Sequence, residues 1–456
     1  NAQGDWINQR DPSYESWQPI GGKDTPDGIF RFRTNGLKTN RDAWVYSYSL
    51  PQLVGRMTTM VEFYNQQAKQ GTLPDTLDPT KFSWNRADKA NVKRRRTYDL
   101  NMGRLYTSTY RPFVKQHVYF DRQLNDMVYG LYDCFPTPGH DNIGFYLTGV
   151  SSHYDFGALV VDTLPNLHVL DTGQFFPRWT WEPVGGRHAA ESGMLDLSGG
   201  EDTEESSTAV GQEGEVLGGY RRVDNITDAT LRSYQAAYGP EVTKDDVFYY
   251  VYALLHSPEY RTRYGADLKK SLPHIPLVAS RENFVVFTTA GRGLADLHLD
   301  YESVEPAPLS LMVDGQEVPW DLRETISPSL LHVEKMRYDR VLQNGKRQDD
   351  KTSIVYNEHV TISGIPAQAR DYLLGSRSAL DWLLDRYRVS THKASGIVND
   401  PNDWMAEGAG GGPTASAQPR YLLDLIARIT TVSVRTQQIV TSLPPLDVFP
   451  AGNHTK

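Results

Sequence analysis

An acidic stretch in the middle of the chain constrains the possible folds more than any other sequence feature. Residues 188–219 contain eight acidic side chains and no lysine or arginine, among many glycines and serines. Such a segment has too few apolar side chains to offset the conformational entropy that ordering it would cost. We therefore expect residues 188–219 to be a disordered insertion that separates two subdomains.

Charge is distributed unevenly along the rest of the chain. The 456 residues carry a net charge of −9, yet residues 1–125 hold 19 lysines and arginines against 12 acids, a balance of +7. The remaining residues therefore carry −16, and the acidic insertion supplies half of that deficit. The total charge argues against a nucleic-acid partner, but the basic first quarter keeps such a partner possible.

Composition also bears on location. The sequence has no run of about 18 apolar residues, as a membrane helix requires, and no signal region at its start. Its single cysteine, Cys134, excludes an internal disulfide and fits a reducing compartment. We expect a cytoplasmic protein with no membrane span. The start at Asn1 and Ala2, without methionine, favours a fragment of a longer protein.

Hydrophobic spacing predicts both helices and strands on each side of the insertion. The expected helices are 51–69, 247–256, 378–387 and 421–440. The expected strands are 113–120, 143–150, 158–161, 353–356 and 359–362. Helices and strands do not alternate regularly, which favours the α+β class. We expect a mixed-sheet subdomain over 46–187, a largely helical α+β subdomain over 220–456, and a flexible glycine-rich loop at 407–419.

Common enzyme motifs are absent. The sequence lacks a phosphate-binding GxxxxGK[ST] loop, a GxSxG nucleophile elbow, an HExxH zinc motif and the Pro-Pro-Tyr motif of amino-methyltransferases. The nearest approach to a nuclease site is Asp349-Asp350-Lys351, in a polar, turn-like run. We therefore expect no catalytic residues, no metal site and no bound cofactor in this chain.

One basic run stands out. Residues 89–96 contain five cations, with tyrosines close behind. The cations of the run, and those that follow it, are Lys89, Lys93, Arg94, Arg95 and Arg96, then Arg104, Arg111 and Lys115. Such clusters attract duplex phosphates, and arginine can also contact guanine edges. A solvated charged surface is an equally good interpretation from composition alone.

Several strings of residues together resemble one family. They are NGLKTNRDAWVY at 35–46, YRPF at 110–113, FPTPGH at 135–140, FYYVYALLHSPEY at 248–260 and GIVNDPNDW at 396–404. The sequence is similar, from about Asp5 to Leu446, to the C-terminal specificity region of type ISP restriction-modification enzymes. In these enzymes one polypeptide also carries a nuclease, a helicase motor and an adenine-N6 methyltransferase.

The resemblance implies a function for the chain. It would recognise a short asymmetric site in double-stranded DNA and present that site to the methyltransferase and helicase modules of the same polypeptide. S-adenosylmethionine, ATP and magnesium would belong to those other modules. Residues 1–45 would be the tail or linker of the methyltransferase, residues 46–187 would face DNA, and the fragment would be a monomer.

The candidate DNA contacts rest on side-chain chemistry, because recognition residues vary with the target site. They are Lys93, Arg94, Arg95 and Arg96 for phosphate or groove contacts, Arg111 and Lys115 for phosphates, and Lys38 and Arg41 for the backbone near the methyltransferase. The alternatives are a structural ion pair at Arg111 and a bracing role for Lys38 and Arg41. For the whole chain, an independent metal-dependent nuclease and a protein-docking scaffold with weak DNA contact remain open.

Overall fold

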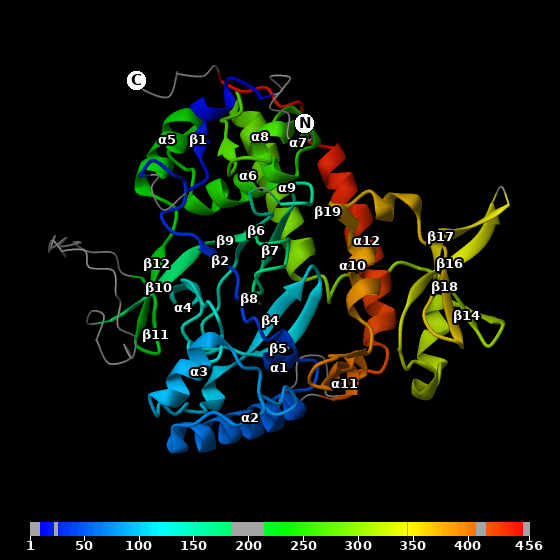
Figure 1. Cartoon of the computed structure of the whole chain (residues 1–456). Coiled ribbons are helices and arrows are strands. Elements are labelled where there is room, and N and C mark those ends of the chain that lie inside the picture. Colours follow the sequence, from blue (N-terminus) through cyan, green and yellow to red (C-terminus); the bar gives the residue numbers. More distant parts are fainter. Residues whose placement is uncertain are drawn as a thin grey trace, which may run out of the picture.

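The chain folds into helices and several separate sheets (Figure 1). These elements pack around two hydrophobic clusters. The structure, a computed structural model, describes residues 10–21, 26–150, 152–184, 214–343, 345–406 and 416–449. This mixture confirms the expected α+β class. Within the described ranges, no helix is both long and apolar enough to cross a membrane.

Two four-stranded sheets lie at the centre of the molecule (Figure 1). The first has the order β3 (Tyr46–Ser47), β5 (Val114–Tyr119), β4 (Leu105–Arg111), β8 (Leu164–Pro165). The second has the order β2 (Thr34–Asn35), β9 (Gln174–Pro177), β6 (Gly144–Leu147), β7 (Ala158–Val161). Because β4 and β8 are parallel and the other pairs antiparallel, the first sheet is mixed, as expected. The strands predicted at 113–120, 143–150 and 158–161 are confirmed as β5, β6 and β7.

A three-stranded sheet joins the two sides of the acidic segment. Strand β10 (Trp179–Pro183) pairs with β12 (Tyr220–Asp224), which also pairs with β11 (Val216–Leu217). Residues 188–213 of the predicted insertion lie outside the described residues, and so do residues 407–415 of the predicted flexible loop. The prediction of disorder was wrong for 214–219, because pairing with β12 supplies backbone partners that composition does not reveal.

The largest sheet lies in the second half of the chain and forms a lobe beside the central sheets (Figure 1). Its order is β15 (Gln316–Val318), β14 (Ser310–Val313), β18 (Val360–Ser363), β17 (Lys346–Val355), β16 (Arg337–Gln343). Strands β17 and β18 confirm the two strands predicted around Asn357. The remaining strands form three short pairs: β1 (Gln18–Pro19) with β13 (His274–Ile275), β19 (Leu373–Leu374) with β20 (Arg377–Ser378), and β21 (Ser390–Thr391) with β22 (Val398–Asn399).

Helices surround these sheets. They are α1 (Asp42–Val45), α2 (Leu50–Gln70), α3 (Arg86–Lys93), α4 (Leu131–Cys134), α5 (Asp228–Tyr238), α6 (Lys244–His256), α7 (Pro258–Arg263), α8 (Gly265–Leu268), α9 (Arg281–Leu299), α10 (Ala379–Arg386), α11 (Pro401–Ala406) and α12 (Tyr421–Thr441). The four predicted helices are confirmed as α2, α6, α10 and α12. Three of them begin at side-chain caps, Ser49 for α2, Thr243 for α6 and Ser378 for α10, which satisfy backbone N–H groups of the first turn.

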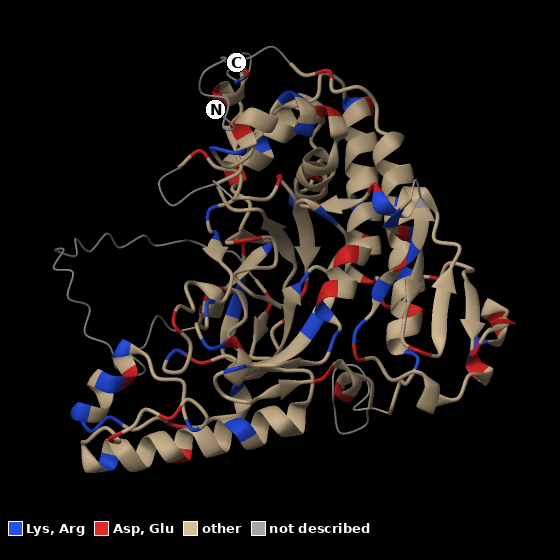
Figure 2. Cartoon of the chain, turned by 45° about the vertical axis from the view of Figure 1, so that its right-hand side comes forward, with Lys and Arg blue, Asp and Glu red and all other residues tan. Residues whose placement is uncertain are grey.

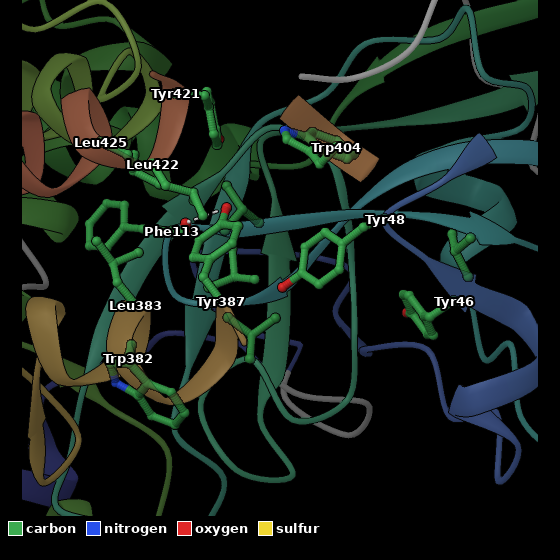
Figure 3. Packing of buried hydrophobic residues seen from close by; sticks show 14 of the residues in the cluster. Tyr46, Tyr48, Phe113, Trp382, Leu383, Tyr387, Trp404, Tyr421, Leu422 and Leu425 are labelled. Atoms are coloured by element: carbon green, nitrogen blue, oxygen red, sulfur yellow. Dashed lines mark hydrogen bonds between the residues drawn. The ribbon is translucent and has the colours of Figure 1, made fainter. Parts of the chain in front are cut away.

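The two hydrophobic clusters do not follow the predicted division of the chain. The first combines residues between 37 and 175 with residues between 301 and 432, and Figure 3 shows Tyr48, Phe113, Tyr387 and Tyr421 packing within it. The second combines residues between 14 and 30, 145 and 176, 226 and 299, and 440 and 446. Both therefore use residues from before and after 188–219. They also include residues of the predicted linker 1–45.

His298 on α9 lies where the two clusters meet. Its Nδ1 is 2.6 Å from the hydroxyl of Tyr252, and its Nε2 is 2.9 Å from the hydroxyl of Thr436 on α12. Its ring also stacks on Tyr372, with 5.1 Å between the ring centroids. Complete burial and nearby Arg261 lower the pKa of His298 from 6.5 to about 3. The imidazole is therefore held neutral at neutral pH.

We predict that the protein loses stability as the pH falls from 7 to 4. Below pH 6.5 the unfolded chain binds a proton at His298, whereas the folded protein does not do so until about pH 3. The unfolded state binds more protons across this window, so stability falls with decreasing pH, by about 3 kcal/mol at pH 4 from this histidine alone. Urea unfolding followed by circular dichroism at pH 7, 5.5 and 4 measures the effect.

The His298→Gln variant is the matched control, because glutamine is polar but does not titrate. Its free energy of unfolding should depend less steeply on pH than that of the unchanged protein, whatever its stability at pH 7. Equal pH dependence in the two proteins would contradict the assignment to His298.

Candidate nucleic-acid interface

Helix α2 forms the floor of the candidate interface. Its residues Leu53, Met57, Met60 and Tyr64 are buried, at the spacing of an amphipathic helix. The helix ends at Gly71, whose φ of 73° lies in the left-handed region that glycine adopts without steric cost. The chain then turns back toward α3, which packs on α2.

Helix α3 begins and ends with well-defined caps. At its start, Asn85 and Asp88 form a reciprocal capping box. At its end, Arg95 has a φ of 57°, its N–H donates to the carbonyl of Val92, and the N–H of Arg96 donates to the carbonyl of Asn91. This is the Schellman arrangement, in which glycine usually occupies the left-handed position. An arginine there is conformationally strained.

Arg95 also joins the ends of the two helices. A Cβ atom at Gly71 would lie only 3.0 Å from the Nε of Arg95, so the guanidinium packs directly over this glycine. The Nη1 of Arg95 lies 3.5 Å from the carbonyl oxygen of Lys69, at the last turn of α2. The strained backbone of Arg95 is thus held in place by a contact that a glycine there could not make.

Exposed cations gather on this pair of helices. We call them the basic cluster: Lys69, Lys81, Arg86, Lys89, Lys93, Arg94, Arg95 and Arg96. Most are exposed, and none forms an ion pair with another residue that the structure describes. Figure 2 shows the basic segments of α3 and the adjoining end of α2 at one end of the molecule. The arrangement is suited to polyanions, because phosphates could bind without displacing a carboxylate.

Sequence reasoning found only part of this cluster. It selected Lys93, Arg94, Arg95 and Arg96, which are contiguous, and missed Arg86 at the start of α3, Lys81 in the segment before α3, and Lys69 at the end of α2. The packing of α3 on α2 brings Lys69 close to the cations of α3. A stack between Tyr64 and Tyr98, with centroids 3.9 Å apart and rings 2° from parallel, fixes that packing.

Arg41, predicted to contact DNA, instead lies inside the protein. Its Nη2 is 2.6 Å from Oδ2 of Asp88, and both side chains are at least 98% buried. Asp88 also accepts hydrogen bonds from the hydroxyl of Tyr98 at 2.7 Å and the N–H of Asn85 at 2.9 Å. Arg41 therefore helps to hold the start of α3, and contact with DNA would require it to leave this site, so its role as a DNA contact stays a prediction.

Three further candidates lie outside the basic cluster and have partners. Lys38 pairs with Asp126 at 2.8 Å on the surface. Arg111 is buried, with its guanidinium 4.2 Å from the centroid of the Tyr110 ring and Nη1 3.0 Å from Asn166. Both cations therefore already have a partner within the protein. Their role as DNA contacts stays a prediction.

Lys115 on β5 is partly buried and has an ion-pair partner. Its Nζ lies 2.7 Å from Glu302 and 5.1 Å from the centroid of the Tyr301 ring. Burial lowers the pKa of Lys115, but Glu302 and Asp162 outweigh burial and raise the pKa above its ordinary value. Lys115 stays charged and links the first central sheet to the chain that follows α9.

No group of three histidine, cysteine or carboxylate side chains suited to a metal occurs in the described part of the chain. Asp349 pairs instead with Arg340 at 3.4 Å, and Asp350 accepts from the N–H and hydroxyl of Thr352. His140 is bonded to Thr137 and to the carbonyl of Leu217.

The family model for the type ISP C-terminal specificity domain matches residues 28–425. No curated protein matches the chain. Among solved structures, it is 29% identical to the type ISP restriction-modification enzyme LlaBIII bound to DNA, with a TM-score of 0.76, covering 98% of this chain and 25% of that one.

Two more solved structures are similar. A nuclease-deletion mutant of the type ISP enzyme LlaGI, in complex with a DNA substrate mimic, is 29% identical with a TM-score of 0.74, covering 98% of this chain and 36% of that one. The DrdV–DNA complex is 28% identical with a TM-score of 0.74, covering 98% of this chain and 40% of that one. The chain thus spans 25–40% of the length of these proteins.

We predict that Asp88→Asn destabilises the protein by about 3–5 kcal/mol, because it leaves the buried charge of Arg41 without a counterion. Urea unfolding at pH 7 measures the change. Asp75→Asn, on an exposed loop, is the control and should have little effect. The double variant Arg41→Met/Asp88→Asn should recover part of the loss. Equal stability of the double and single variants would show that the pair does not hold α3.

Proposed function

Because the chain belongs to the family of type ISP C-terminal specificity domains, we propose that it recognises a specific sequence in double-stranded DNA. It would do so as one module of a longer polypeptide, presenting the site to methyltransferase and helicase modules that the chain itself does not contain. Chemistry on DNA, with S-adenosylmethionine, ATP and magnesium, would belong to those modules. The structures to which the chain is similar include complexes with DNA, which supports the proposal.

The basic cluster is the observation that carries the proposal. No salt bridge within the described residues involves its eight cations, and most of them are exposed, so phosphates could bind them without displacing a bonded carboxylate. A protein that neutralises phosphates releases the counterions condensed on DNA, and its affinity therefore falls steeply with salt. The rigid caps of α3 hold the cluster in one arrangement before binding, which lowers the entropic cost of association.

The cations of the basic cluster differ in their contacts, and we expect them to differ in their roles. Arg95 packs over Gly71, so it would contact the DNA backbone while fixing the helix ends. Lys93, Arg94 and Arg96 are exposed and lack such a contact. We propose that these three residues position the duplex and that arginine forks among them reach base edges.

Substitution of Lys93, Arg94 and Arg96 by glutamine tests the proposal while leaving Arg95 in place. The affinity for duplex DNA at about 0.15 M salt should fall on the order of 100-fold, and the slope of log affinity against log salt should become shallower by about 2.7, for three lost phosphate contacts. Fluorescence anisotropy over about 50–200 mM salt measures both quantities. Arg232→Gln on α5, an exposed cation outside the cluster, is the control.

Sequence specificity needs a separate measurement. Selection of bound duplexes from a randomised library should enrich one asymmetric motif. Folded protein that enriches no motif and binds without salt dependence would favour the docking-scaffold alternative. Metal-dependent cleavage of DNA by the isolated chain would favour the nuclease alternative.

A further inference from the structure

Strands β16 and β17 extend beyond the rest of the five-stranded sheet as a two-stranded ribbon (Figure 1). We call this ribbon the arm, defined by residues 339–343 of β16 paired with residues 346–350 of β17. Its pairing is offset from that of the sheet. While β16 advances one residue, from Tyr338 to Asp339, the paired residue of β17 changes from Ile354 to Asp350. This bulge is where the arm leaves the sheet.

The bend at the base of the arm is held by specific contacts. The carboxylate of Asp350 accepts from the N–H and the hydroxyl of Thr352, at 2.9 and 2.6 Å. The Nζ of Lys351 lies 3.8 Å from Asp381 on α10 and 5.4 Å from the centroid of the Tyr338 ring. The contacts of Asp350 and Lys351 therefore fix the direction in which the arm leaves the sheet.

The outer part of the arm is cationic and exposed. The end of the arm, residues 341–348, contains two cations, Lys346 and Arg347, and no acid, whereas Asp339, Arg340, Asp349 and Asp350 lie nearer its base. Arg340 has one exposed carboxylate neighbour, Asp349, at 3.4 Å, while Lys346 and Arg347 form no ion pair with any described residue. Exposed pairs of this kind contribute little to stability.

Apolar side chains accompany these charges. Leu342 is 74% exposed and Val341 is 43% exposed, on opposite faces of the ribbon. An isolated two-stranded ribbon is only marginally stable in water, and exposed apolar residues on both faces offer no stabilisation there. Such a ribbon is best explained by a partner that contacts both faces at once.

We propose that the arm is a second DNA contact, which enters a groove of the duplex at a distance from the basic cluster. The proposal rests on the proposed function, since it assumes that the chain binds duplex DNA. A major groove about 12 Å wide admits a two-stranded ribbon and contacts both of its faces. The cations would meet the phosphates that line the groove, and Leu342 would contact thymine methyl groups or a base step.

A DNA partner fits these observations better than a protein partner. An acid-free, cationic tip of this length matches a surface of closely spaced phosphates, whereas protein interfaces are depleted of lysine at their centres. Figure 1 places the arm and α3 on opposite sides of the molecule. A duplex bound at the basic cluster would therefore have to be long before it reached the arm.

Dependence on duplex length provides the first test. The variant Lys346→Gln/Arg347→Gln should bind about 12 base pairs as tightly as the unchanged protein. On about 40 base pairs it should bind roughly 10-fold more weakly, with a salt slope shallower by about 1.8. Arg232→Gln/Arg281→Gln, which removes the same charge from α5 and α9, is the control. An equal effect of the arm and control variants on the long duplex would overturn the proposal.

Cross-linking provides a direct test. Cys134 is fully buried and burial raises the pKa of its thiol, so Leu342→Cys provides a single reactive thiol at the arm. A photoactivatable cross-linker attached there should react with the 40-base-pair duplex. Cross-links only to protein, or none, would exclude the arm as a DNA contact. If binding persists and Lys93, Arg94 and Arg96 prove essential, the proposed function stands without the arm.

Discussion

The buried ion pair between Arg41 and Asp88 fixes the part of the molecule on which the proposed function depends. Asp88 caps α3, accepts the hydroxyl of Tyr98 and neutralises Arg41, so one carboxylate connects a helix start, an aromatic stack and the preceding turn. Three donors bind the carboxylate of Asp88, namely Arg41, the hydroxyl of Tyr98 and the N–H of Asn85, and they compensate for the cost of burying its charge. The exposed cations of α3 repel one another, and the contacts of Asp88 keep the helix in place despite this repulsion.

Local structure was largely predictable from the sequence because local physics determines it. Hydrophobic spacing predicts α2, α6 and α10, and all three are present; the caps that begin α6 and α10, at Thr243 and Ser378, also act within a few residues. The wrong prediction of disorder for residues 214–219 had a different cause. Val216 and Leu217 pair with β12 through the backbone, and composition carries no information about such a partner.

Whether each cation is exposed or has a partner inside the protein was much harder to predict. Lys115 and Arg94 look alike in a linear sequence, yet Lys115 meets Glu302 from a segment 187 residues away, while Arg94 lies at an exposed helix end. Arg41 and Arg111 are buried through contacts with Asp88 and Asn166, which lie 47 and 55 residues further along the chain. The contiguous run 93–96 was found because a short helix and its cap keep neighbours in sequence together on the surface.

The two hydrophobic clusters interleave segments from both halves of the chain, and this has a consequence for how the protein is made. The second cluster needs residues near Trp17 and residues near Leu446, and Val278 pairs with Val448. Contacts of such long sequence separation slow folding, because distant segments must meet before burial repays the entropy of ordering them. During synthesis, the apolar side chains of the early segments therefore stay exposed until α12 and the residues after it have left the ribosome. Synthesis of this region is thus a period of exposure to chaperones and to aggregation.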